Sequence, residues 1–457
     1  MPHVLRPRLL VALSIALVIG TNPAPVQAAS PPPDGGRPIV GAAERPQGEA
    51  LRDAMALRAA LGLPADRAST LRPFQDGGVR VHGLALTAPE AAAVEALAVA
   101  QDRTRALLEI AASDPDVVTT YYEGATLHVA VSGDARAFRA ALRADQARAR
   151  NVIVRQVDRS RVTLEAILER LASDLPELRD EGLGVVEFGI DPLTAEVEVV
   201  VQAGGAVSPE TALRERYGDG VKVRVDDWTG ELLACDVTSC GTRGGLAARV
   251  PGLAACTTGF VAKDTPKVPY APTFQMVTAG HCIRAAGGVG SGPWRNGALS
   301  LTWGASTRQY FHDMAVTDAG RFALGANVPT VRNSYYVGGG SVVGISARMS
   351  DAGQAVGKVV CRHGVVSDYG CGVIRATERR VVLSGTTIQR LWKVQLRSQH
   401  GDSGAGFIHQ PAPREPWQAA GILSGGSFDG TTHFTWYGTV LDAERYVGHR
   451  TCTTPSC

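Results

Sequence analysis

The distribution of the cysteines constrains this chain most, because all eight of them follow residue 230. They are Cys235, Cys240, Cys256, Cys282, Cys361, Cys371, Cys452 and Cys457. None of them forms a C-x-x-C pair, and an even number of cysteines behind an export signal favours disulfides over a metal site. We therefore expect a cysteine-free region followed by an oxidised one, with no metal and no other cofactor.

The beginning of the chain has the pattern of a secretory signal peptide. Arg6 and Arg8 precede an apolar run over Leu9–Gly20, and the sequence Val26-Gln27-Ala28 suits signal peptidase. A membrane anchor would need an apolar run of about 18 residues or more. We expect residues 1–28 to be removed and the product to be secreted and extracellular, with no membrane association.

The charge balance limits the class of partner. The 457 residues carry a formal net charge of +2 and no long run of one sign. A nucleic-acid partner is not indicated, because such proteins display a basic footprint. We expect a monomer that acts on protein or peptide substrates.

The cysteine-free region, residues 29–230, contains a repeated α/β pattern of strand, turn, strand, helix and strand. The first copy has strands over 117–122, 127–131 and 152–157, with a helix after Asp134; the second has strands over 185–190, 197–201 and 221–225, with a helix after Ser208. Another helix between the copies places Leu164, Ile167, Leu168 and Leu171 on one face. The pattern predicts two similar small subdomains, with no chemistry apparent in either.

The oxidised region, residues 231–457, consists of short β-branched runs separated by Gly, Ser, Asn and Pro. Such a pattern is typical of an antiparallel barrel or sandwich. A stretch of this length would suit a pair of small barrels.

His281 is the first candidate for chemistry in the oxidised region. It follows an apolar strand over Phe274–Val277 and precedes Cys282, which could tether the imidazole at the strand end. An incidental histidine beside a structural disulfide is the alternative interpretation.

Asp313 and Ser403 are the other two candidates. Asp313 heads an apolar run and could be buried against an imidazole, or it could lie in a solvated turn. Ser403 stands between Gly401-Asp402 and Gly404, where small residues allow a tight turn that exposes the hydroxyl, although such turns are also common without catalysis. The presence of His, Asp and Ser in one oxidised β region favours a Ser-His-Asp catalytic triad.

These segments resemble the chymotrypsin-fold serine proteases of bacteria, the streptogrisin and α-lytic protease group. The order His, Asp, Ser is also that of the chymotrypsin template. The segments that carry the resemblance are 256–260, 278–282, 313–316, 360–362, 371–372, 401–404 and 421–426. Residues 189–192 and 216–219 are similar to parts of the pro-regions of that group.

The resemblance implies a double antiparallel β-barrel in which Ser403 attacks a peptide carbonyl and His281 takes its proton. Asp313 would orient the imidazole. The amides of Gly401 and Ser403 would hold the oxyanion. The residues implied to bind substrate are Ser424, Gly425 and Gly426.

The resemblance also implies structural pairs. Cys256–Cys282 and Cys361–Cys371 match bridges of the group, which leaves Cys235–Cys240 and Cys452–Cys457 as short terminal loops. Asp402 should be buried, with Arg362 as its ion-pair partner.

The chain departs from the group at three places that bear on activity and specificity. Ala405 stands where a second glycine is usual, and no cysteine precedes the Ser403 motif. Leu423 replaces the histidine of relatives that prefer Glu, so we expect an apolar P1 preference, unless Arg397 near the pocket floor overturns it.

Alternatives remain for both regions. The oxidised region could be a catalytically inactive homologue that acts as a binding protein; a secreted esterase would normally have an α/β fold with Ser before His. The cysteine-free region is expected to be a folding assistant and inhibitor of the protease, or else an independent accessory domain. We expect maturation between Trp228 and Val250.

Overall fold

The computed structural model describes residues 45–143, 151–202, 208–226, 231–232, 244–250, 254–264, 274–296, 302–324, 333–337, 342–411 and 415–454. The expected signal peptide and the cysteines Cys235, Cys240 and Cys457 lie outside these residues. Within the described part, no helix is both long and apolar enough to span a membrane.

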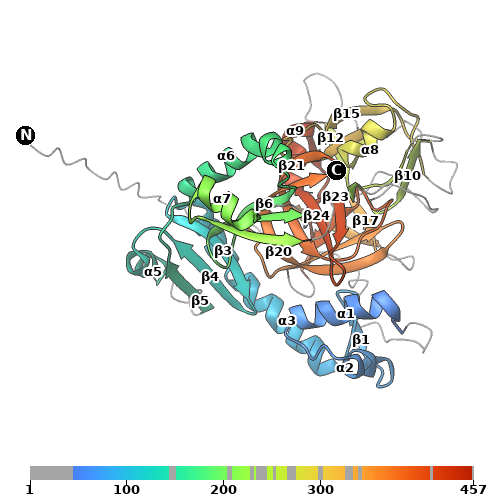
Figure 1. Ribbon diagram of the computed structural model, residues 1–457. Coiled ribbons are helices and arrows are strands. Elements are labelled where there is room, and N and C mark those ends of the chain that lie inside the picture. Colours follow the sequence, from blue (N-terminus) through green and yellow to red (C-terminus); the bar gives the residue numbers. More distant parts are fainter. Residues whose placement is uncertain are drawn as a thin grey trace, which may run out of the picture. The chain divides into compact units, whose positions relative to one another are not determined.

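The first described segment is mainly helical (Figure 1). It contains α1 (Gly48–Ala60), α2 (Arg67–Leu71), a 3₁₀ turn (Arg72–Phe74), β1 (Val79–Val81), β2 (Leu84–Leu86), α3 (Ala88–Arg103) and α4 (Arg105–Ser113). A capping box starts α3, since Glu90 Oε2 accepts a hydrogen bond from the Thr87 amide at 2.9 Å. Leu57, Leu86 and Val94 belong to the same apolar cluster as residues of the later β region, so this segment packs onto that region.

The predicted repeat is present in the structure. The first copy is β3 (Val117–Glu123), β4 (Thr126–Val131), α5 (Ala135–Arg143) and β5 (Val152–Gln156); the second is β6 (Val185–Asp191), β7 (Glu196–Gln202), α7 (Pro209–Tyr217) and β8 (Val221–Asp226). In each copy the first two strands are antiparallel and the third is parallel to the second. Between the copies lies α6 (Arg161–Asp180), which buries Leu164, Leu168 and Leu171 as predicted, while Ile167 is partly buried against the same cluster.

The second copy extends a sheet of the later region. Its strand β6 pairs antiparallel with β20 (Asp368–Leu383), with Phe188 opposite Arg380 and Glu187 opposite Val381. Backbone hydrogen bonds therefore join the cysteine-free region directly to the oxidised region.

The first half of the oxidised region has two sheets around one core. The strands are β10 (Ala247–Val250), β11 (Ala254–Thr257) and β14 (Arg295–Asn296) in one sheet, and β12 (Val261–Asp264), β13 (Phe274–Thr278), β15 (Ser306–Tyr310), β16 (Ala319–Ala323) and β25 (His449–Thr451) in the other. Both sheets contribute to a cluster that includes Val250, Met276, Trp294 and Phe322.

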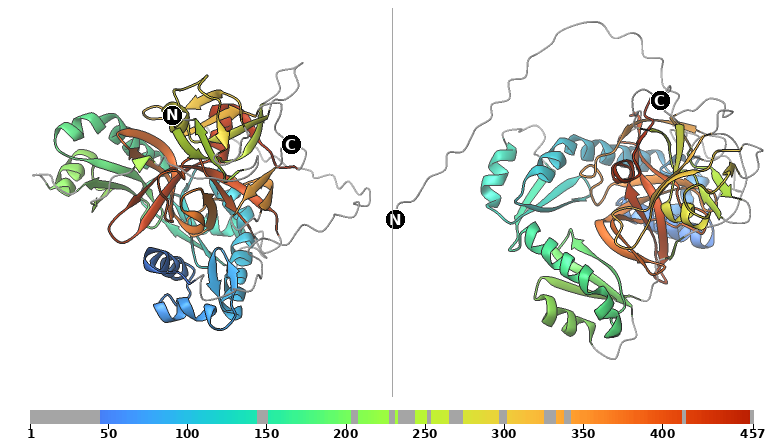
Figure 2. Two further views of the ribbon diagram at one scale, coloured as in Figure 1. Left: turned by 90° about the vertical axis from the view of Figure 1, so that its right-hand side faces the viewer. Right: turned by 90° about the horizontal axis from the view of Figure 1, so that it is seen from above.

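The second half closes on itself. Its closed ring consists of β19 (Val359–Gly364), β20, β21 (Thr386–Gln395), β24 (His433–Thr439), β23 (Trp417–Phe428) and β22 (Gly406–His409), each paired antiparallel with the next and β22 with β19. The strands of this ring are coloured orange to red in Figure 2. Strands β17 (Ser334–Tyr336) and β18 (Val342–Arg348) join it at β23, and α9 (Val440–Val447) follows β24. The ring confirms the predicted barrel architecture.

Two of the four expected disulfides lie within the described residues. Cys256 is bonded to Cys282, and Cys361 is bonded to Cys371, as the resemblance implied. The first bridge connects β11 to α8 (Gly280–Ala285), the short helix that carries His281.

Candidate functional site

His281 is held by Asp318. The helix α8 begins directly after β13, and Asp318 lies just before β16, which pairs with β13. One carboxylate oxygen of Asp318 is 2.6 Å from His281 Nδ1, and the other accepts the His281 backbone N–H at 2.9 Å. Asp318 is fully buried, so the ring is fixed from both its side chain and its backbone.

The expectation that Asp313 orients His281 is not supported by this geometry. Asp313 is exposed in a turn, and its carboxylate accepts the backbone N–H of Thr387 at 2.9 Å. The alternative of a solvated turn describes it correctly. Sequence reasoning missed Asp318, although it too precedes a short run that forms a strand. We therefore replace Asp313 with Asp318 as the acidic partner of His281.

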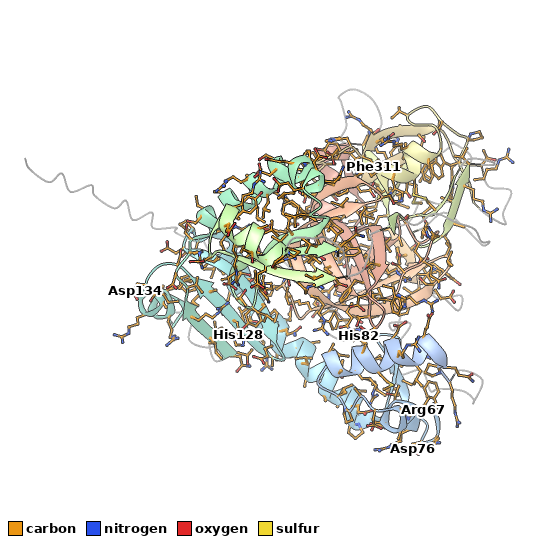
Figure 3. The ribbon with its side chains drawn as sticks, in the orientation of Figure 1. Arg67, Asp76, His82, His128, Asp134 and Phe311 are labelled. Carbon is orange, nitrogen blue, oxygen red and sulfur yellow. A yellow bond between two sulfur atoms is a disulfide. The ribbon has the colours of Figure 1, made fainter. Side chains whose placement is uncertain are left out.

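Close packing surrounds the histidine segment. A Cβ at Gly280 would lie 2.6 Å from the Tyr310 carbonyl oxygen and 2.8 Å from that of Ala319, so a larger residue would displace the backbone. The His281 ring meets the ring of Phe311 edge-on, with centroids 5.9 Å apart. Phe311 is labelled beside α8 in Figure 3.

The Ser403 turn depends on glycine at both ends. Gly401 and Gly404 have φ values of +108° and +86°, a region that side chains disfavour. A Cβ at Gly404 would also lie 2.1 Å from Thr278 Oγ1. The turn is therefore pressed against the end of β13, the strand that leads to His281.

Residues of the first half of the oxidised region form hydrogen bonds to the backbone of this turn. The Thr257 amide donates to the Ser403 carbonyl at 2.8 Å, and the Thr257 hydroxyl donates to the Gly401 carbonyl at 2.6 Å. Cys282 Sγ lies 3.9 Å from the Ser403 carbonyl oxygen. The structure thus brings Ser403 together with the disulfide-linked His281 segment, at the boundary between the two halves.

Asp402 is buried, as expected. Its carboxylate accepts backbone N–H groups from Val366 at 3.0 Å, Ser367 at 3.2 Å and Gln399 at 2.9 Å. The guanidinium of Arg362 is 3.5 Å away. The predicted pair of Asp402 and Arg362 is confirmed, and it anchors the loops on either side of the turn.

Ala405 fits without distortion. Its amide donates to the Asp402 carbonyl at 2.9 Å, and its carbonyl accepts from Leu423 at 2.9 Å. Its methyl group packs in the apolar cluster with Phe407 and Leu423. The next position is the one that requires glycine, because a Cβ at Gly406 would lie 2.7 Å from Phe260 Cζ.

The strand with the expected substrate-binding residues already has a partner. Ser424, Gly425 and Gly426 lie in β23, and the short strand β9 (Glu231–Leu232) pairs antiparallel with it. Leu232 lies opposite Gly425, and Glu231 lies opposite Gly426. Sequence reasoning did not identify this pairing.

Two groups of histidine and cysteine in the described residues have the proximity of a metal site: His82 with Cys361 and Cys371, and His281 with Cys256 and Cys282. In each group the two sulfur atoms are joined to each other. Zinc sites use cysteine as a thiolate, which a disulfide does not provide. Neither group therefore fits a thiolate-ligated metal.

Comparison with known proteins finds similarity over part of the chain. Streptogrisin-C of Streptomyces griseus is 29% identical over 205 residues, which are 44% of this chain and 39% of that protein. The matched stretch thus spans about two fifths of the length of this relative. The match agrees with the predicted resemblance to the streptogrisin group. No protein-family model matches the chain.

Solved structures in the comparison include two proteases from other bacteria. Thermobifida fusca Protease A is 23% identical, with a TM-score of 0.37, over 47% of this chain and 100% of that protein. Nocardiopsis Protease is 27% identical, with a TM-score of 0.37, over 46% of this chain and 99% of that protein.

Proposed function

We propose that this protein is a secreted serine endopeptidase, made as a precursor, that hydrolyses peptide bonds through an acyl-enzyme on Ser403. The observation that carries the proposal is the buried pair of His281 and Asp318, packed beside the Ser403 turn. The similarity to Streptogrisin-C supports it.

In the proposed reaction Ser403 Oγ attacks the peptide carbonyl while His281 Nε2 accepts its proton. His281 then donates that proton to the leaving amine, and a second cycle with water releases the acyl group. Asp318 accepts the Nδ1–H, which selects the tautomer with a free Nε2 and stabilises the imidazolium. General-base catalysis of this kind contributes about 10²–10⁴-fold.

The oxyanion would be stabilised by the amides of Gly401 and Ser403. The positive φ of Gly401 supports this assignment, because it turns the peptide groups of the segment relative to ordinary strand geometry. Thr257 bonds the carbonyls of both residues and so holds the orientation of the turn. One such donor is worth about 3–4 kcal/mol in the transition state.

The cysteine-free region would assist folding and block the active site until it is removed. The pairing of β9, the two residues directly after this region, with β23 supports this role, because an extended peptide substrate would add to the same strand. Leu232 lies opposite Gly425, next to Ser424 in the strand. Maturation in the residues that follow β9 would agree with the expected range of 228–250.

The proposed P1 preference is for apolar side chains. Gly425 and Gly426 add no side chains to the wall of the pocket, and Leu423 occupies the position that is histidine in relatives with a preference for Glu. Hydrolysis of a peptide series that varies only at P1 tests this preference.

The triad assignment is tested with a matched pair of variants. Asp318→Asn should lower kcat by about 10⁴-fold, because the wrong histidine tautomer results, whereas Asp313→Asn should retain most activity. A fluorophosphonate probe should label Ser403 in the secreted protein, as located by mass spectrometry, and His281→Ala should abolish the label. An Asp313→Asn variant as inactive as Asp318→Asn would contradict the assignment. A folded, processed protein that takes no label would instead indicate an inactive homologue that acts by binding.

A further inference from the structure

Helix α1 presents two carboxylates to a basic site beside β23. Glu49 and Asp53 are four residues apart, so they lie on one face of the helix. Glu49 Oε2 is 2.9 Å from Arg397 Nη2. Burial raises the pKa of Asp53, while the nearby His433 and Arg397 lower it. This helix face therefore places two acids over one arginine and one histidine of the oxidised region.

Arg397 and His433 lie close to the expected substrate strand. Arg397 lies in the loop between β21 and the Ser403 turn, and this loop is tied to β24 by the Thr435 hydroxyl, which donates to the Leu396 carbonyl at 2.7 Å. His433 in β24 lies opposite Phe428. Phe428 is the last residue of β23 and lies two positions beyond Gly426. The basic site is thus built on the loop and strands that adjoin the proposed active site.

Two polar atoms at this end of β23 lack a hydrogen-bond partner in the described part of the chain. Among the described residues, His433 Nε2 and Ser427 Oγ are buried without a hydrogen-bond partner. Of the described acidic residues, Glu49 is the one that forms an ion pair with Arg397. When the cysteine-free region leaves, the basic site therefore loses its carboxylate.

We propose that Arg397 and His433 bind an acidic side chain of the peptide substrate, and that Glu49 and Asp53 occupy this site in the precursor. A guanidinium suits this role, because it binds a carboxylate through two parallel N–H groups. The backbone of Arg397 is held by Arg362, which donates to its carbonyl and also pairs with Asp402. The proposal rests on the proposed function and adds a substrate preference to it.

The test uses the mature enzyme and pairs of peptides that differ only by Glu against Gln at one position other than P1, scanned along the substrate. One position should show kcat/KM about tenfold higher for Glu, which is the lower end of what a hydrogen bond to a charged group contributes. Arg397→Gln should abolish this ratio, Arg397→Lys should retain part of it, and the exposed control Arg308→Gln should leave it unchanged. Equal rates for Glu and Gln at every position, or a ratio that survives in Arg397→Gln, would overturn the proposal.

Two controls separate this inference from the proposed function. Labelling of Ser403 and cleavage of the Gln peptides by wild type report the proposed peptidase. Their absence would contradict the proposed function, whereas equal rates for Glu and Gln in an active enzyme would contradict only this inference. If Arg397→Gln does not fold, wild type is assayed at low and high salt; the Glu preference should fall with salt, and a constant ratio would overturn the proposal.

Discussion

Among the contacts between the cysteine-free region and the oxidised region, two differ in how their buried charges are balanced. At the first, where β6 pairs with β20, Glu187 lies 2.7 Å from both Arg379 Nε and Lys393 Nζ. At the second, beside α3, a small cavity is lined by His82, Lys358 and His409, and its lining contains no acidic side chain. At the first contact, the buried basic groups form ion pairs with a carboxylate. At the second contact, the basic side chains line a cavity that no acidic side chain lines.

The pKa shifts of the buried groups differ between the two contacts for the same reason. Burial by itself would raise the pKa of Glu187, but Lys393 and Arg379 lower it to about 2. Burial lowers the pKa of Lys358 to about 8, although the charge of Asp102 opposes this shift. Burial also lowers the pKa of His409 to about 3 and the pKa of His82 to about 4. The first contact therefore favours charged groups, and the second favours neutral ones.

The largest expected effect is at the first contact. Glu187→Gln would leave Arg379 and Lys393 buried with their main acid removed, which should cost about 3–5 kcal/mol. The urea midpoint of the full chain carrying Ser403→Ala, which prevents self-cleavage, measures the loss. The control Glu378→Gln breaks a half-exposed pair with Arg161 and should cost about 1 kcal/mol or less. Equal losses of stability in the two variants would contradict the larger contribution that we assign to the buried cluster around Glu187.

Exchange of each buried lysine for methionine sharpens the comparison. Lys358→Met should stabilise the same full chain by about 2 kcal/mol, because it removes a buried charge that lies 5.5 Å from the Tyr122 ring and is stabilised only in part by Asp102, with no ion pair to it among the described residues. Lys393→Met should destabilise it, because Glu187 loses a partner at 2.7 Å. Urea denaturation at pH 7 compares the two; changes of the same sign would contradict the difference between the contacts.

The smallest effect concerns acidification. His409 is neutral in the folded chain down to about pH 3, whereas in the unfolded chain it takes up a proton near its ordinary pKa of about 6.5. Stability is therefore lost as the pH falls below about 6.5, by about 1 kcal/mol at pH 5.5. Glu187 keeps its charge until about pH 2, so the first contact is unaffected in this range.

Denaturation at pH 7.5 and pH 5.5 measures this loss in the full chain. His409→Gln should lose about 1 kcal/mol less than the parent, and the exposed His312→Gln should behave like the parent. The groups that face His409 also include His82, Lys358 and Arg105, so a remaining pH dependence in His409→Gln is expected from His82. An unchanged pH dependence in His409→Gln would refute the role of this residue.

Much of the fold could be predicted because its signals are local. The repeat of strand, turn, strand, helix and strand follows from hydrophobic periodicity, and each observed strand agrees with its predicted range to within one residue at either end. The capping box at Thr87 and Glu90 also lies within one turn of helix. The glycines around Ser403 indicated a tight turn from neighbouring residues alone.

The choice between Asp313 and Asp318 could not be made locally, because each precedes a short run of mainly small or apolar residues. Strand register decides between them. Thr278 lies opposite Gly320, which places Asp318 beside the residues that follow β13, including His281. Asp313 lies in a turn outside this pairing and contacts Thr387 instead.

The sequence by itself determined two regions of different type, the repeated α/β units and the His281 and Ser403 segments, since these depend on residues close together in the chain. Tertiary structure alone decided the acidic partner of His281, the pairing of β9 with β23 and the charge balance of the two contacts. The physical reason is that each of these depends on strand register or burial between segments far apart in sequence, and such contacts leave no local pattern.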